Sequence, residues 1–466
     1  MKMDLEFVCR SVQGKLLQGK PDQCITAVET DSRNICLASL FVPLRGERFD
    51  GHRFIADALQ SGAAATLVEQ RALQELDFPA DKGVVLVEDT LQSLQNLARA
   101  YRQQFRVPVI AVTGSVGKTT TRQMIVSCLQ QRYPVLHPSG NYNNEIGLPL
   151  TLLRMEPFHR AAVVELAMSA RGEIEQLATI SRPDYAVITN VAGVHLETLG
   201  SLENIAQAKC EVLGLIGEDG FALLNGDSPF LLEAAEPFSC RKYTFGYNSD
   251  CDFCILDAFS GPEGLTIEAR MRGKQIKLGF PVPTTYLATN VIAAAALCEL
   301  MGLDREEVQL GLDNYKPVGG RLRILKGPYH TNIIDDTYNA NPLSMAAALE
   351  TGREIKSDQG RLIAVLGDMF ELGATEIEGH LAVGKSAARV GVTHLITVGQ
   401  RAGYIAQGAI DAGLAADKVH SFFDKTPALE HLRYIIKDND TIVFKASRGM
   451  QLETMIDKLM KLENQT

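Results

Sequence analysis

Three features are missing from this sequence. It has no tryptophan, no apolar run approaching the roughly 18 residues of a membrane-spanning helix, and no long run of Lys and Arg. The net charge of -10 and the lack of a basic cluster argue against a nucleic-acid surface, because phosphate binding needs clustered cations. The segment Met1–Glu6 is too acidic and interrupted to resemble a signal peptide. We therefore expect a cytoplasmic protein that binds neither a membrane nor nucleic acid.

The cysteines show no metal-binding pattern. All nine are scattered, as expected of reduced thiols in a cytosolic enzyme. Cys251 and Cys254 form a C-x-x-C with Cys240 upstream, but a zinc site would want a second such pair or nearby histidines. We therefore interpret these cysteines as small apolar residues within strands.

The length and the alternation of apolar runs predict three domains of an α/β protein. A domain holds about 150 residues, and the chain has 466. We expect a small N-terminal α/β domain (1–82), a central domain with a mostly parallel sheet (83–315) and a C-terminal domain (316–466) with the βαβ alternation of a Rossmann-like sheet. Short alternating runs at 241–246 and 265–270 predict antiparallel strands appended to the central sheet. No G-x-G-x-x-G follows the first strand of the last domain, which argues against NAD binding.

A phosphate-binding strand, loop and helix is predicted at 109–121. An apolar β-branched run leads into Thr-Gly-Ser-Val-Gly-Lys-Thr-Thr, and a helical apolar pattern follows. Glycines let backbone N–H groups approach phosphate oxygens, Lys118 neutralises terminal phosphates, and Thr119 can bind Mg²⁺. Val112 stands where the longer P-loop has its first glycine, so this is a shorter variant. The expected nucleotide-binding residues are Thr113, Gly114, Ser115, Val116, Gly117, Lys118, Thr119 and Thr120.

Candidate metal ligands lie near the ends of the next strands. Glu165 follows an apolar strand, and burying a lone carboxylate costs several kcal/mol unless it is paired or bound to a cation, so we expect Mg²⁺ beside it. His195 follows another strand; an isolated histidine is more often structural, but this one falls near the same rim. Lys209 sits among apolar residues, where it either extends to water or, desolvated, takes up CO₂ as a carbamate that can bind a metal.

Other polar segments are candidate ligand contacts. The amide-rich loop 137–147 either turns tightly or contacts a ligand, and Asn290, near the start of a helix, can read an adenine edge or satisfy local backbone. At Asp50–Gly51, spacing alone slightly favours a plain turn over a ligand-binding loop. Strand ends in the last domain carry Asp335, Asp336, Tyr338, Asn339, Asn341, Asp368, Lys445, Ser447 and Arg448.

Together these motifs resemble the Mur ligase family, the ATP-dependent amide-forming enzymes of peptidoglycan precursor synthesis, over nearly the whole length. The markers are the 113–120 loop, Gly140 to Pro149, Val164-Glu165-Leu166, Thr189-Asn190-Val191 with His195, Ala208-Lys209 and Gly320-Arg321. Within the family, 335–342 and 367–373 are similar to the enzyme that adds D-alanyl-D-alanine to UDP-N-acetylmuramoyl-tripeptide. The ligase that adds the third amino acid would carry an Asp-Tyr-Ala-His type sequence near Tyr338, where this chain has Tyr-Asn-Ala-Asn-Pro.

The resemblance implies a reaction and roles for these residues. ATP would phosphorylate the tripeptide carboxylate, and the amine of D-alanyl-D-alanine would attack the acyl phosphate. Two Mg²⁺ are implied, one held by Thr119 and Glu165 and one near His195 and a carbamylated Lys209. The implied catalytic residues are Lys118, Glu165, His195, Lys209 and Arg321; Asn290, Arg321, Asp335 and Asp336 would bind the nucleotide; and Ser32, Arg45, Asp50, Gly51, His52, Asn141, Asn144, Tyr338, Asn339 and Asn341 would bind substrates. The partners are then small molecules, and we expect a monomer.

Three alternatives remain to be weighed. A non-catalytic nucleotide switch of the GTPase kind would need an Asn-Lys-x-Asp stretch, which the chain lacks. A folylpolyglutamate-synthase-like enzyme usually lacks the N-terminal UDP domain. The 31–52 region therefore argues against this alternative. The Mur ligase that adds the third amino acid is the nearest alternative.

Overall fold

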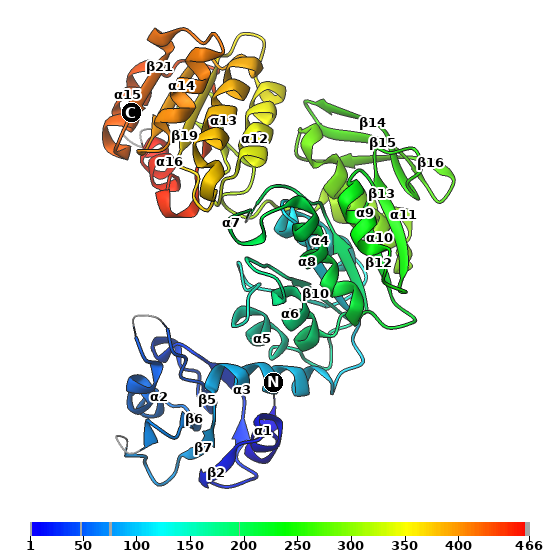
Figure 1. The fold of residues 1–466 in the computed structure, drawn as a ribbon, viewed down its shortest axis with the longest axis vertical. Helices are drawn as coiled ribbons and strands as arrows, with labels where there is room; N and C mark the ends of the chain where they lie inside the picture. The colour runs from blue at the N-terminus through cyan, green and yellow to red at the C-terminus, as the bar shows by residue number, and fades with distance from the viewer. Residues whose placement is uncertain (1, 47–48, 74–76, 195, 462–466) are drawn as a thin grey trace.

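The computed structural model describes residues 2–46, 49–73, 77–194 and 196–461. They form three α/β units that follow one another along an elongated molecule, with the N-terminal unit at one end and the C-terminal unit at the other (Figure 1). Within the described residues, no helix combines the length and apolar character needed to cross a membrane.

The N-terminal unit is built on a five-stranded sheet in the order β2-β7-β6-β5-β4. Strands β4 to β7 are parallel, and β2 pairs antiparallel with β7. The elements are β1 (Met3–Asp4), α1 (Leu5–Val12), β2 (Lys15–Gln18), β3 (Cys24–Ile25), β4 (Ala27–Glu29), β5 (Ser39–Phe41), α2 (Ile55–Gln60), β6 (Ala65–Glu69) and β7 (Gly83–Val87). Because β7 belongs to this sheet, the predicted boundary at residue 82 is wrong by at least one strand.

Helix α3 (Thr90–Arg102) connects the first unit to the second (Figure 1). It starts beside β6, where the backbone N–H of Thr90 donates to the Glu69 carboxylate. Further along, Gln95 donates to the Glu145 carbonyl at 3.2 Å and the Tyr101 hydroxyl donates to the Met155 carbonyl at 3.0 Å. One rigid element therefore contacts both units.

The central unit holds a nine-stranded sheet in the order β16-β15-β14-β13-β12-β11-β8-β10-β9. Its strands are β8 (Val109–Thr113), β9 (Val135–Leu136), β10 (Ala161–Glu165), β11 (Tyr185–Ile188), β12 (Phe221–Asn225), β13 (Arg241–Gly246), β14 (Phe253–Gly261), β15 (Gly264–Met271) and β16 (Lys274–Phe280). Its helices are α4 (Lys118–Leu129), α5 (Gly147–Leu152), α6 (Glu173–Ser181), α7 (Leu196–Leu199), α8 (Leu202–Cys210), α9 (Pro229–Ala235), α10 (Ala288–Leu300) and α11 (Arg305–Asp313).

Two cores cover the two faces of this sheet. Along β8, Val109 and Ala111 pack into one core while Ile110 and Val112 pack into the other, as period-two alternation in a doubly covered strand requires. The appended antiparallel ribbon is confirmed for β14, β15 and β16. The antiparallel prediction for 241–246 is wrong, because β13 pairs parallel with both β12 and β14.

The C-terminal unit is a six-stranded sheet in the order β17-β18-β22-β19-β20-β21, parallel except for the β17 and β18 pair. Helices cover both faces of this sheet, as a Rossmann-like fold requires. The elements are β17 (Arg323–Gly327), β18 (Thr331–Asp335), α12 (Pro342–Ile355), β19 (Leu362–Gly367), α13 (Glu376–Val390), β20 (His394–Val398), α14 (Gly403–Asp411), β21 (Val419–Phe422), α15 (Lys425–Ile435), β22 (Thr441–Lys445) and α16 (Glu453–Met460).

Helix α12 makes polar contacts with the segment just before α10. The Thr284 and Thr351 hydroxyls are 2.8 Å apart and fully buried. The backbone N–H of Thr285 donates to the Glu354 carboxylate at 2.9 Å, and its hydroxyl donates to the same carboxylate. These contacts fix the C-terminal unit against the central one.

Candidate active site

A cavity of about 630 Å³ lies between the central and C-terminal units. The loop 115–120 after β8 and the polar loop 143–145 line one side of it. The linker 320–322 and the segment 336–341 after β18 line the other. The cavity therefore lies where strands end in two separate parallel sheets, which is where open α/β sheets bind ligands.

The predicted phosphate-binding loop has the expected local geometry. Gly117 precedes α4 with a φ of +82°, and a Cβ there would lie 2.3 Å from the Asn290 amide nitrogen. The Lys118 ammonium donates to the Gly114 and Ser115 carbonyls at 2.8 and 3.3 Å. Burial lowers the pKa of Lys118, and Arg321 lowers it further, whereas Glu165 opposes this shift. The lysine thus closes its own loop and lines the cavity.

Glu165, at the end of β10, is 2% exposed and has polar partners on both oxygens. The Thr119 hydroxyl donates to Oε2 at 2.8 Å, and the Asn143 amide donates to Oε1 at 2.9 Å. Adjacent ligands of an octahedral Mg²⁺ at 2.0–2.1 Å lie about 3 Å apart, which is close to the spacing of the Thr119 and Glu165 oxygens. Hydroxyl and carboxylate oxygens are also hard donors, so this pair fits a magnesium ion.

Lys209, on α8, is 2% exposed. Burial lowers its pKa well below the ordinary lysine value, and the nearby Lys118 adds to the shift. An amine in this environment is unprotonated more readily and can react with CO₂. His195 lies outside the described residues, so its predicted role as a metal ligand stays a prediction. In the described part of the chain, no group of three or more His, Cys, Asp and Glu side chains could hold a metal.

On the C-terminal side of the cavity, Arg321 and Asp336 face the phosphate-binding loop 113–120, here called the P-loop. The Arg321 guanidinium stacks on the Tyr338 ring, 4.0 Å from its centre, and its Nε is buried without a hydrogen-bond partner among the residues that the structure describes. Asp336 pairs with the buried Lys445 at 2.5 Å, and Lys445 also donates to the Asn339 carbonyl at 2.8 Å.

The two neighbouring aspartates differ in their use. Asp335 accepts hydrogen bonds from the Gly320 N–H at 3.2 Å and the Thr337 hydroxyl at 2.7 Å, and it does not line the cavity. Asp336 does line it. Of the two, the geometry therefore favours Asp336 as a nucleotide contact.

The amide residues predicted to bind substrate are only partly brought together. Asn144, Tyr338, Asn339 and Asn341 line the cavity, whereas Asn141 is exposed and does not. Asn341 also caps α12, accepting from the Ser344 N–H at 2.8 Å. Asn290 lines the cavity while its Nδ2 donates to the Thr121 hydroxyl at 2.8 Å, which leaves its Oδ1 for a ligand.

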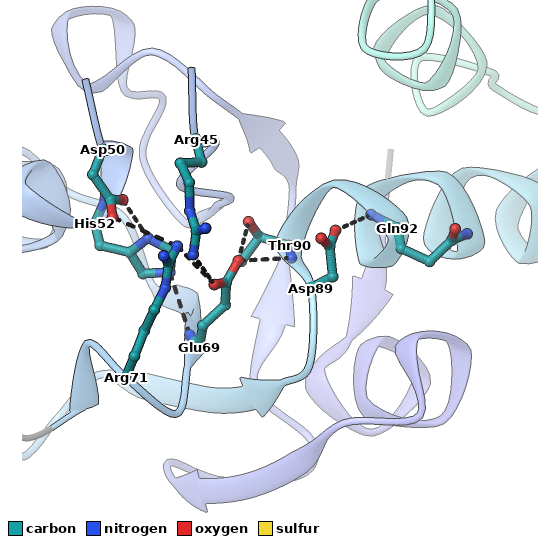
Figure 2. A network of polar contacts seen from close by, with 8 residues as sticks. All are labelled: Arg45, Asp50, His52, Glu69, Arg71, Asp89, Thr90 and Gln92. Carbon is teal, nitrogen blue, oxygen red and sulfur yellow. Dashed lines mark hydrogen bonds and ion pairs between the residues drawn. The ribbon is translucent and has the colours of Figure 1, made fainter. Parts of the chain in front are cut away.

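A second polar site forms on the N-terminal unit, at the carboxyl ends of its parallel strands (Figure 2). At the end of β6, Glu69 accepts hydrogen bonds from Arg45 at 3.1 Å and pairs with Arg71 at 2.8 Å. The Glu69 N–H donates to His52 Nε2 at 3.3 Å, so His52 carries its proton on Nδ1 and donates it to Asp50 at 2.7 Å. We call Arg45, Asp50, His52, Glu69 and Arg71 the N-terminal rim.

Two further predicted residues, Gly51 and Ser32, lie at the same edge of the sheet as this rim. A Cβ on Gly51 would lie 2.5 Å from the Leu44 carbonyl oxygen, so only glycine fits that turn. Ser32 lies in a short 3₁₀ helix after β4, at the same edge of the sheet. Glu69 and Arg71 were not predicted. Glu69 is a carboxylate that ends an apolar strand, and the same signal led to the prediction of Glu165.

The cysteines of the C-x-x-C are buried in the fold. Cys254 lies in β14, and Cys251 packs just before it. Burial raises the pKa of Cys251 to about 11, which disfavours the thiolate that a metal would need.

Comparison with protein families and known proteins gives concordant matches over nearly the whole chain. Three family models match: "Mur ligase family, catalytic domain" at 24–102, "Mur ligase middle domain" at 112–298, and "Mur ligase, glutamate ligase domain" at 320–448. The UDP-N-acetylmuramoyl-tripeptide–D-alanyl-D-alanine ligase of Bacillus subtilis is 37% identical over 462 residues, covering 99% of both chains. Its namesake from Escherichia coli is 34% identical and covers 96% of both.

Solved structures agree. MurF from Acinetobacter baumannii superposes with a TM-score of 0.89 at 30% identity, covering 99% of both chains. MurF ligase from Thermotoga maritima in complex with ADP has a TM-score of 0.82 at 28% identity, covering 94% of this chain and 98% of that one.

Proposed function

The chain belongs to the Mur ligase family, and from this premise we propose that it joins D-alanyl-D-alanine to UDP-N-acetylmuramoyl-tripeptide at the expense of ATP. The product is the UDP-linked pentapeptide precursor of peptidoglycan. The observation that carries this function is a cavity lined on one side by the P-loop and on the other by the Tyr338 to Asn341 turn. ATP and a second substrate can meet there.

The reaction proceeds through an acyl phosphate. The terminal carboxylate of the tripeptide attacks the γ-phosphorus of ATP, and ADP leaves. The amine of D-alanyl-D-alanine then attacks the acyl carbon, loses a proton, and inorganic phosphate leaves with formation of the amide. Lys118 and the N–H groups at the start of α4 stabilise the charge of the transferring phosphoryl group.

Thr119 and Glu165 would hold Mg²⁺, as their oxygen spacing allows. When bound, the ion neutralises phosphate charge as the phosphoryl group transfers. The second predicted ion would be held near His195 and Lys209. Lys209 supports this through its desolvated amine, which reacts with CO₂ to give a carbamate and a proton.

Other residues that line the cavity bind the nucleotide and the peptide substrates. Asn290 and Arg321 hold the nucleotide, with Asp336 beside them. The buried Nε of Arg321, which lacks a partner among the described residues, is an N–H available to a ligand oxygen. Asn144, Asn339 and Asn341 supply amides for the dipeptide and for the end of the tripeptide.

The N-terminal rim holds the UDP group. Arg45 and Arg71 present two guanidinium groups to a diphosphate, and Ser32, Asp50 and His52 complete the edge. We place the enzyme in the cytoplasm, because its substrates are small water-soluble molecules, and we keep the expectation that it is a monomer.

Phosphate release tests this function. Purified protein with ATP and Mg²⁺ is given UDP-N-acetylmuramoyl-tripeptide and D-alanyl-D-alanine separately and then together. Release that requires both, with a UDP-pentapeptide by mass spectrometry, is the expected result. Turnover with a UDP-dipeptide and a free diamino acid would instead identify the ligase that adds the third residue, and no release with either pair would refute the ligase function.

A further inference from the structure

The buried arginine of helix α4 has no role in the chemistry above. Arg122 lies one turn after Thr119, and its side chain is 1% exposed. It is the largest fully buried side chain among the described residues. A guanidinium in such a place loses its hydration, so contacts within the protein must compensate.

The Arg122 guanidinium contacts two separate segments. Nη1 and Nη2 donate to the Pro138 and Gly140 carbonyls at 3.2 and 3.4 Å. Nε lies 3.4 Å from Oε2 of Glu165. This second contact is an ion pair rather than a hydrogen bond, and Nε is buried without a hydrogen-bond partner among the described residues.

Both segments lead to the same carboxylate. Oε2 of Glu165 is the oxygen that accepts from Thr119, and Oε1 accepts from Asn143 in the loop 137–147. Arg122 holds the start of that loop through two carbonyls. The arginine therefore sets the position of Glu165 directly and the position of its other partner, Asn143, through the loop.

We propose that Arg122 is a positioning residue that fixes Glu165 and the loop 137–147 as one unit for binding the nucleotide with Mg²⁺. This inference rests on the proposed function for the role of Glu165 toward Mg²⁺. The contacts themselves join protein atoms only. Removing Arg122 frees the Glu165 side chain to rotate away from Thr119 and loosens the loop that carries Asn143 and Asn144.

Arg102 is a matched control. It is also a buried arginine that donates to two backbone carbonyls, those of Ser181 at 3.2 Å and Phe105 at 2.8 Å. It pairs with a carboxylate, Asp184, at 3.4 Å. Arg102 lies on α3 and does not line the cavity. Replacing it removes a similarly bonded arginine, 10% exposed and paired with the half-exposed Asp184, without touching Glu165.

The test compares Arg122→Met, Arg122→Lys and Arg102→Met with the wild type. Hydrogen exchange of 138–147 is measured in the protein without ligand. ADP affinity is measured by calorimetry in EDTA and across a Mg²⁺ titration. We expect Arg122→Met to speed exchange in the loop and to raise the Mg²⁺ concentration needed for tight ADP binding roughly 10- to 100-fold, the usual effect of removing the partner of a metal ligand. ADP affinity in EDTA should stay within about twofold, since the P-loop contacts remain.

The lysine variant keeps the charge but cannot reach both segments, so its Mg²⁺ requirement should be intermediate. It also serves if the methionine variant does not fold. Arg102→Met should lower thermal stability and leave the loop exchange and the Mg²⁺ requirement unchanged.

Three results would overturn the inference: Arg122 variants that match Arg102→Met in every readout, Mg²⁺ binding that tightens in Arg122→Met because a competing cation has gone, or wild-type ADP affinity that ignores Mg²⁺. None of these measurements uses the UDP substrate or the dipeptide. A failure of the proposed ligase reaction would therefore appear in the phosphate-release assay and not here.

Discussion

Glu69→Gln is the most informative single change at the N-terminal rim. It keeps the side-chain shape and removes the charge that holds two guanidinium groups. The side chain of Glu69 is 11% exposed, whereas those of Arg45 and Arg71 are 51% and 43% exposed. The carboxylate thus anchors from inside the protein two arginines whose heads reach solvent (Figure 2).

Two opposing effects decide the result for UDP binding. An arginine that is already ordered saves about 0.5–1.5 kcal/mol on binding, so releasing Arg45 and loosening Arg71, which keeps its ion pair with Asp50 at 3.5 Å, costs up to roughly 2 kcal/mol. Removing a negative charge beside the diphosphate strengthens UDP binding by less than about 1 kcal/mol, because water screens these half-exposed ion pairs. The net loss is about 1 kcal/mol, or about fivefold in affinity.

Calorimetric titration with UDP and with UMP measures this effect. The loss should be larger for UDP, since UMP lacks the second phosphate. Glu350→Gln removes an exposed helical pair with Arg353 in the C-terminal unit and should leave both affinities unchanged. UDP binding that is unchanged or tighter in Glu69→Gln would refute the anchoring argument.

Three further changes probe the phosphate-binding loop, the buried lysine of α8, and the contact between α12 and the segment before α10. Lys118→Met should lower kcat/KM roughly 10²- to 10³-fold in the phosphate-release assay, since it removes a preorganised charge at the transferring phosphoryl group, and a smaller loss would argue against that role. Burial lowers the pKa of the unmodified Lys209 amine below 10.5, so between that lowered pKa and 10.5 the unfolded chain binds more protons than the folded one. In CO₂-free buffer, where Lys209 is not carbamylated, wild-type stability should therefore rise with pH in this window, while thermal denaturation of Lys209→Met should show a flatter profile and higher stability at neutral pH. Equal slopes would contradict this account. Glu354→Ala removes the acceptor of both Thr285 hydrogen bonds. It should speed hydrogen exchange at 284–287 and at the end of α12 but not in the P-loop. Unchanged exchange at both segments would show that the contact does not hold the two units together.

Local chemistry made part of the site predictable. The P-loop and the Thr119 and Glu165 pair could be identified because each motif is short and follows an apolar strand. Asp335 and Asp336 could not be separated, since both follow β18 and only the path of the linker at Gly320 decides which carboxylate is used. Arg122 was missed because its partners lie 16 and 43 positions away, in a different loop and a different strand.

The errors in the fold have similar causes. An apolar strand such as β7 carries no signal for the sheet it joins, so it was assigned to the second unit. Strand β13 was expected to be antiparallel because polar and aromatic residues alternate from Lys242 to Phe245, but only its last two residues are buried. A half-exposed parallel strand shows the same alternation.

Helix α3 sets the distance between the N-terminal rim and the cavity. It starts at the N-terminal rim and contacts the loop beside the P-loop through Gln95, so a rigid α-helical segment fixes the separation between the two sites. With the UDP group held at the rim, a peptide of the wrong length would present its carboxylate short of the P-loop or beyond it. The substrate would then be selected by its length before the chemistry of its last residue is tested.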